Sequence, residues 1–90
     1  MPYIKQDRRV AIDGGEPPET AGELTYAMAV LVNEYLTRRG HCFDAFGEVW
    51  AAFSSARFEF ERRTVAGYEQ GKIAENGDVP GYGPTVDCYD

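Results

Sequence analysis

Cysteine and histidine are scarce in this chain, which has two cysteines and one histidine among its 90 residues. Two cysteines are too few for the disulfide framework of a small secreted domain, so we expect Cys42 and Cys88 to be free thiols. A zinc site needs about four ligands in spaced pairs, and His41, Asp44 and the two cysteines lack that spacing. The sequence therefore predicts no metal site.

Long apolar runs and an excess of basic residues are also missing. The longest apolar run, residues 26–32, is far shorter than the roughly 20 residues that span a membrane, and no apolar signal segment opens the chain. Acidic residues outnumber basic ones by 15 to 9, which gives a net charge of −6. A nucleic-acid coat needs a dominant basic face instead. We expect a soluble, cytoplasmic protein without general nucleic-acid binding and without a membrane partner.

Motifs for catalysis or cofactor binding are absent as well. His41 and Cys42 are neighbours in sequence, and no third group is evident to orient the imidazole for nucleophilic catalysis. Glu59 and Glu61 diverge on a helix, and the glycines around Tyr82 follow no strand, as a phosphate-binding loop would require. The sequence predicts a protein that is not an enzyme and binds no cofactor.

The stretch from residue 43 to 77 holds the single tryptophan and a helical apolar pattern. One row recurs at three- and four-residue steps: Phe46, Val49, Trp50, Phe53, Ala56, Phe60 and Thr64. A second, narrower row contains Ala51, Phe58 and Val65. Two apolar rows on one helix imply two packing partners, and we expect Trp50 near the centre of a helical core.

A first long helix is predicted at about residues 21–39. Thr20 and Glu23 form a capping-box pattern at its start, and Arg38, Arg39 and Gly40 suit its end. Its core stripe is predicted to contain Leu24, Ala27, Met28, Leu31 and Tyr35. Tyr26, Ala29, Val30 and Val32 make the opposite face apolar too. A helix that is apolar nearly all round is buried on more than one side.

These patterns predict a single all-α domain over residues 1–90. Its core is an antiparallel helical hairpin within residues 20–77, built from helices at about 21–39 and 43–76. Residues 1–19 form an irregular arm with a short helical turn after Asp7, and residues 78–90 form an irregular tail. The second helix overhangs the first, and glycines at 67 and 71 indicate a kink or a close helix contact there. We expect a homo-oligomer whose interface contains Tyr26, Val30, Phe58 and Val65.

Several arginines are candidates for binding an anionic ligand. Arg57 lies near the stripe of Phe53 and Phe60, where its guanidinium needs a carboxylate or a ligand. A low-molecular-weight phosphate ligand such as a cyclic nucleotide would be held where the arm meets the second helix. The candidate ligand-binding residues are Tyr3, Lys5, Arg8, Arg9, Arg57, Arg62 and Arg63. In the competing interpretation, Asp7, Glu59 and Glu61 neutralise these arginines in ordinary salt bridges.

Three short segments carry a resemblance to a known group of proteins. They are Tyr-Ile-Lys-Gln at residues 3–6, Glu-Phe-Glu-Arg-Arg at residues 59–63, and Glu-Asn-Gly-Asp-Val at residues 75–79. With these, the chain resembles a small family of uncharacterised proteins encoded by tailed bacteriophages and prophages. Those proteins have a tyrosine in place of Glu61 and a proline in place of Gly67. The resemblance implies a phage accessory protein of the host bacterial cytoplasm, without an assigned activity.

Two classes of function follow from this resemblance and the charge pattern. A counter-defence factor would either sequester an anionic nucleotide signal or inhibit a host protein. The alternative is a minor structural or assembly protein of a phage. Basic residues that converge on a pocket would favour the nucleotide, whereas an exposed apolar patch would favour a protein partner.

Overall fold

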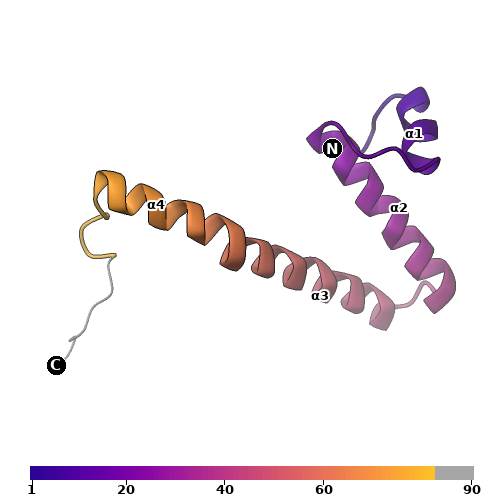
Figure 1. Cartoon of the computed structure of the whole chain (residues 1–90). Helices are drawn as coiled ribbons and strands as arrows, with labels where there is room; N and C mark the ends of the chain where they lie inside the picture. Colours follow the sequence, from indigo (N-terminus) through magenta and orange to yellow (C-terminus); the bar gives the residue numbers. More distant parts are fainter. Residues whose placement is uncertain (83–90) are drawn as a thin grey trace. The chain divides into compact units, whose positions relative to one another are not determined.

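Helices account for the regular structure of the chain in the computed structural model, which describes residues 1–82 (Figure 1). They are α1 (Gln6–Asp13), α2 (Ala21–Arg39), α3 (Phe43–Phe60), the π-helical segment η1 (Glu61–Val65) and α4 (Ala66–Asn76). No strand occurs among residues 1–82. The predicted all-α class is therefore confirmed.

The chain divides into two units, Met1–Trp50 and Ala51–Asp90, with the division inside α3. The first unit contains α1, α2 and the first turns of α3. The second contains the rest of α3, η1 and α4. The expectation of a single domain over residues 1–90 stays a prediction.

α1 is a longer element than the helical turn predicted for the arm. It begins at Gln6, and its N-cap Lys5 accepts backbone hydrogen bonds from the amides of Arg8 and Arg9, both at 3.1 Å. Asp7 does not cap the helix but lies in its first turn, where a negative charge suits the helix dipole. The helix ends where Gly14 donates to the carbonyl of Val10 at 3.0 Å.

α2 has the bounds that its end signals predicted. The Thr20 hydroxyl accepts the amide of Glu23 at 3.1 Å, which is one half of the capping box. The other half differs, because the Glu23 carboxylate accepts the amide of Glu19, at 3.0 Å, in place of the Thr20 amide. At the far end Gly40 adopts φ 109°, which favours glycine, and its amide donates to the Leu36 carbonyl at 2.8 Å.

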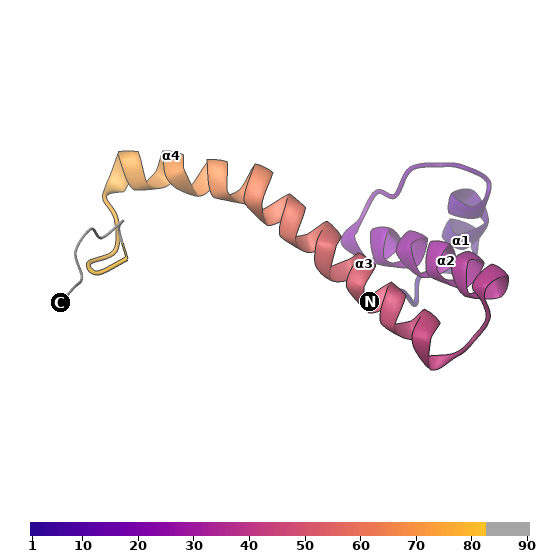
Figure 2. The ribbon, with the colours of Figure 1, turned by 90° about the horizontal axis from the view of Figure 1, so that it is seen from below.

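α1 packs on α2 within the first unit, and both ribbon views show the two helices side by side (Figures 1 and 2). The arm before α1 also lies on the first turn of α2. A Cβ atom at Gly22 would come within 3.0 Å of the Met1 carbonyl oxygen and 3.5 Å of Ile4 Cγ2. Glycine is therefore needed at residue 22 for this close approach.

A polar cluster ties the end of α2 to the start of α3. The Arg39 guanidinium donates to both oxygens of Glu48, with Nε and Nη2 each 3.1 Å from an oxygen, and the Tyr35 hydroxyl donates to the same carboxylate. These donors lower the pKa of the Glu48 carboxyl, the Tyr35 hydroxyl first. These contacts hold the end of α2 against the start of α3.

The predicted hairpin core is not seen within the first unit. Leu31 of the expected core stripe is 66% exposed, and Trp50 is 70% exposed. The placement of Trp50 at the centre of a core is therefore wrong, because the described contacts join α2 and α3 through polar side chains near the connection. The antiparallel hairpin as a whole is not confirmed and stays a prediction.

The second predicted helix, residues 43–76, is helical throughout but is not one regular α-helix. Five residues, Glu61–Val65, form the π-helical segment η1. A Cβ atom added at Gly67 or Gly71 would meet nothing within 4 Å, so the expected close contact at these glycines is not found among the described residues. The irregularity precedes them, at η1.

The end of the helix agrees with the Asn-Gly signal. Gly77 follows α4 with φ 90°, and its amide donates to the Ile73 carbonyl at 2.7 Å. Beyond it, the Tyr82 amide donates to the Val79 carbonyl at 3.0 Å, which forms a turn. The predictions for Cys88 and for the rest of the tail lie outside the described residues.

We predict that Thr20→Ala destabilises the chain by about 1 kcal/mol, because it removes the hydroxyl that satisfies an amide of the first turn of α2. The matched control is Thr25→Ala on the same helix, where the hydroxyl donates to the Ala21 carbonyl at 2.9 Å, an oxygen inside the helix and not an uncapped amide. Alanine is the better helix former, so this change is expected to be neutral or stabilising. Urea unfolding followed by circular dichroism measures both, and equal losses would contradict the capping role.

Candidate functional site

Arg8 is the centre of a charged cluster between α1 and the start of α2. Its Nε lies 3.0 Å from Glu23 Oε2 and its Nη2 lies 2.9 Å from Glu23 Oε1, a bidentate pair. Glu16 and Glu19 add longer contacts of 3.5 and 3.6 Å. Glu23 is buried, with 6% of its surface exposed. This arginine therefore serves the packing of α1 on α2.

The same geometry shifts both partners toward their charged forms. The hydrogen bond from Arg8, followed by the amide of Glu19, lowers the pKa of the Glu23 carboxyl. The hydrogen bond to Glu23 raises the pKa of Arg8 above its already high ordinary value. The pair stays ionised over the physiological range.

Arg9 and Tyr26 form a second link between α1 and α2. The Arg9 Nε donates to the Ile4 carbonyl at 3.0 Å, and its guanidinium lies 5.6 Å from the centre of the Tyr26 ring. The Tyr26 hydroxyl donates to the Asp13 carboxylate at 3.0 Å. Burial, followed by this hydrogen bond, raises the pKa of Tyr26. The chain's own α1 therefore contacts a residue that was predicted to face another subunit.

A hollow of about 450 Å³ adjoins this link. Its lining consists of Asp13, Tyr26, Ala29, Val30, Asn33 and Glu34. Two carboxylates and no basic side chain face it, so its charge is unsuited to an anionic nucleotide.

The arginines of the second unit are paired locally. Arg57 Nε lies 3.2 Å from Glu61, and Arg62 Nη2 lies 2.9 Å from Glu59. Within residues 1–82, Lys5 and Arg63 make no salt bridge, and Tyr3 is 79% exposed.

The seven predicted ligand-binding residues therefore lie in two groups, four in the first unit and three in the second. Their convergence on one ligand stays a prediction. The competing interpretation, in which carboxylates neutralise the arginines, is found for Arg57 with Glu61 and for Arg62 with Glu59, while Arg8 is held by Glu23. The sequence indicated Glu59 and Glu61 as neutralising carboxylates but not Glu23 as the partner of Arg8, because Arg8 and Glu23 lie 15 residues apart on two different helices.

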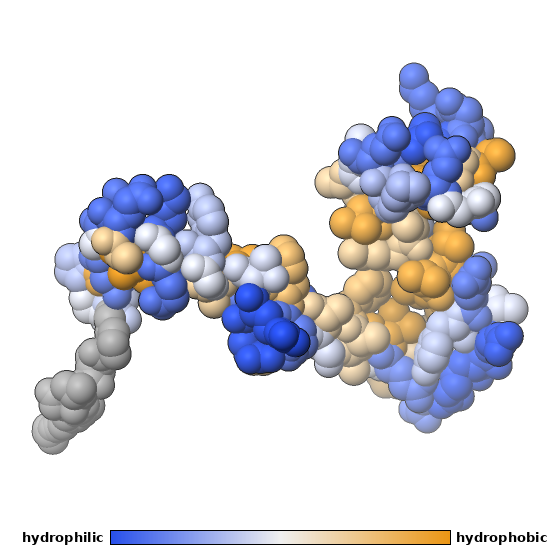
Figure 3. Space-filling view, in the orientation of Figure 1, coloured by the Kyte–Doolittle hydropathy of each residue, from blue (hydrophilic) through white to orange (hydrophobic). Residues whose placement is uncertain are grey.

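The most extensive feature of the described surface is apolar. Ala45 is the one apolar residue among those described that is buried. Large side chains are exposed on α2 (Leu24, Met28, Leu31 and Tyr35) and on α3 and α4 (Phe43, Phe46, Trp50, Phe53, Phe58, Phe60 and Tyr68). Figure 3 shows apolar side chains along α2 and along α3. Of the predicted oligomer interface, Phe58 is 63% exposed, while Tyr26, Val30 and Val65 are half-buried.

No cluster of metal ligands assembles in the part of the chain that is described. No group of three or more histidine, cysteine or acidic side chains is placed to hold a metal among residues 1–82. Cys42 is an exposed free thiol. Among the same residues, no helix is long and apolar enough to cross a bilayer.

Paired charges and exposed apolar side chains characterise the described helices. The chain belongs to the family described as Domain of unknown function (DUF6899), whose model matches residues 1–79. No curated protein matches the chain, and no solved structure matches it.

We predict that the stability of the chain falls as the pH is lowered from 6 toward 3. Because the pKa of Glu23 is lowered by folding, its contribution is present above the unfolded pKa of about 4.3 and is lost as the pH falls through the folded value. Glu23→Gln should flatten this part of the pH profile and lower stability at neutral pH.

The control for this change is Glu16→Gln, which alters the longer and exposed contact of Arg8. Urea unfolding at each pH compares the two variants. Profiles that change equally in both would show that the buried pair is not the source of the pH dependence.

Proposed function

We propose that the protein is a non-enzymatic phage accessory factor that acts by binding another protein, most simply a host protein that it inhibits. The resemblance of its motifs to phage-encoded proteins supports the phage assignment. The exposed apolar surface supports a protein as the target. The alternative is a minor structural or assembly protein of a phage.

One observation carries the choice of a protein target: Ala45 is the single buried apolar residue among those described. Burial of apolar surface contributes about 25 cal/mol per Å², and isolated soluble proteins rarely expose apolar patches beyond a few hundred Å². Side chains such as Leu31, at 66% exposed, gain this free energy only when another surface covers them. A protein surface with complementary apolar groups supplies that cover.

The nucleotide alternative has less support. Arg8 and Arg62, on which it depended, each hold a carboxylate at 2.9 Å. A phosphate would have to displace these carboxylates, and in a chain with a net charge of −6 it would meet a repulsive field. The described hollow beside α1 and α2 is acidic as well.

Native mass spectrometry of the tagged protein, purified from the bacterial host, tests this proposal. We expect a stoichiometric protein partner and no nucleotide mass, with the partner lost in Leu31→Lys on the exposed row of α2. Thr37→Lys introduces the same charge at an exposed position of α2 outside that row and should retain the partner. Both variants are first checked for unchanged helix content.

Calorimetry with cyclic di- and trinucleotides provides the opposing outcome. Nucleotide binding to the wild type that is lost in the Arg8→Ala, Arg62→Ala double variant would replace the protein-inhibitor proposal by nucleotide sequestration. A partner that stays bound to both lysine variants would show that the α2 row is not the contact.

A further inference from the structure

The aromatic residues of the long helix have a spacing that the π segment explains. Phe53 and Phe60 are seven residues apart, whereas Phe60 and Tyr68 are eight apart. Seven residues make nearly two α-helical turns, so the first two rings lie in one row. In a regular α-helix, the eighth residue would place Tyr68 about 80° around the helix from Phe60.

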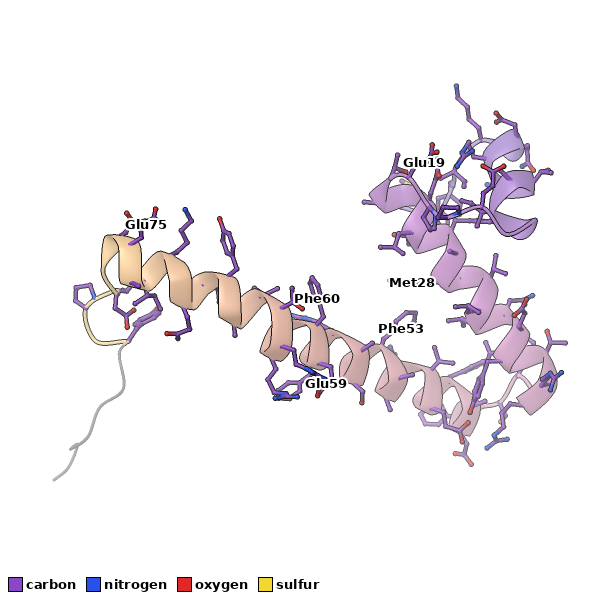
Figure 4. The ribbon with its side chains drawn as sticks, viewed as in Figure 1. Glu19, Met28, Phe53, Glu59, Phe60 and Glu75 are labelled. Carbon is purple, nitrogen blue, oxygen red and sulfur yellow. The ribbon has the colours of Figure 1, made fainter. Side chains whose placement is uncertain are left out.

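η1 lies between Phe60 and Tyr68 and takes up the extra residue. A turn closed by an i→i+5 hydrogen bond holds about one residue more than an α-helical turn. Tyr68 therefore returns to the row of Phe53 and Phe60. Figure 4 shows Phe53 and Phe60 on the same side of the helix, with Glu59 on the opposite side.

This aromatic row, defined by Phe53, Phe60 and Tyr68, is largely exposed within the described chain, although the Lys72 ammonium lies 5.8 Å from the centre of the Tyr68 ring. The three side chains are 44%, 60% and 68% exposed. Since α2 has 19 residues and spans about 28 Å, it could cover at most the first half of a helix of about 50 Å from residue 43 to 76. α2 is therefore too short to reach the half that contains Tyr68.

We propose that a second copy of this chain covers the aromatic row, with the two long helices antiparallel and crossing at Thr64. Phe60 and Tyr68 are each four residues from Thr64. A two-fold axis at Thr64 therefore places Phe60 of each copy against Tyr68 of the other. Such an isologous contact needs a self-complementary surface, which this spacing provides.

Arg57 selects the antiparallel direction. It lies between Phe53 and Phe60 on the row side of the helix, seven residues before Thr64, and Gly71 lies seven residues after. In the antiparallel pair Arg57 faces the open space at Gly71, where a Cβ atom would meet nothing within 4 Å. In a parallel pair the Arg57–Glu61 pair of one copy would face the same pair of the other, so two long side chains would meet at one position, whereas the antiparallel pair sets each against a glycine.

The rings of the row supply part of the area that a stable dimer needs. An aromatic side chain offers about 150–250 Å², so at the measured exposures the three rings leave about 350 Å² per copy. A standard interface buries about 800 Å² per partner. The rings supply close to half of that area, and the neighbouring Ala56, Val65 and the stem of Arg57 lie on the same side to add to it.

This proposal goes beyond the proposed function, because it needs no host protein and is tested on the purified full chain alone. Sedimentation at tens of micromolar should find a dimer for the wild type. The double variant Phe60→Lys, Tyr68→Lys should dissociate at least tenfold more readily. The matched double variant Ser55→Lys, Gln70→Lys places the same charges on the opposite face and should keep the wild-type affinity.

A wild type that is monomeric at tens of micromolar, or a double variant at the row that dimerises as the wild type does, would overturn the proposal. The direction is read by thiol cross-linking after Cys42 and Cys88 are changed to serine. A mixture of Phe60→Cys and Tyr68→Cys chains should cross-link between the two variants. Cross-links confined to like variants would overturn the antiparallel pairing.

The role of η1 is tested by deleting one residue. Deletion of Thr64 shortens the spacing of Phe60 and Tyr68 to seven, so a regular α-helix keeps both rings in the row and the dimer should persist. Deletion of Ser55 shortens the spacing of Phe53 and Phe60 to six, moves Phe53 out of the row, and should raise the dissociation constant at least tenfold. A dimer lost on deletion of Thr64 and kept on deletion of Ser55 would overturn the assignment of the row.

Discussion

The described helices of this chain leave most of their apolar side chains exposed. Among the described residues only Ala45 is a buried apolar residue, although the chain is 43% hydrophobic. A chain of 90 residues has little margin for such exposure, because small domains bury a low fraction of their surface even when fully packed. Association through the uncovered rows is therefore the common requirement behind both the proposed protein target and the proposed dimer.

Polar contacts set the local geometry of the helices. Glu23 is shared by the Arg8 guanidinium and the amide of Glu19, so one buried carboxylate both orients α1 and helps to begin α2. Glu48 has the corresponding place at the other end of α2, where it accepts from Tyr35 and Arg39. Exposed ion pairs contribute little to stability, but a bidentate pair of arginine and carboxylate fixes how the two side chains are oriented. These contacts position the helices and leave their apolar rows free.

The π segment connects the fold to the proposed assembly. π turns are rare and are often found at functional sites. Here η1 contains Arg62 and Arg63, which the sequence singled out as ligand-binding residues, yet Arg62 is held by Glu59 at 2.9 Å. In the proposed assembly η1 needs no ligand. Its extra residue turns the following part of the helix, so that Tyr68 faces the same side as Phe53 and Phe60.

The helices were determined by local sequence. Signals that act within a few residues predicted the bounds of the helices. α2 was predicted from the Thr20 cap and Gly40, and the long helix from its apolar spacing and Gly77. The eight-residue step from Phe60 to Tyr68 is also present in the sequence, but the π-helical turn between them was found only in the structure. The partner of Arg8, the cover of Tyr26 by α1 and the exposure of Trp50 were decided by tertiary structure. Each depends on which elements meet, and a periodic pattern shows that a face is apolar without showing what covers it.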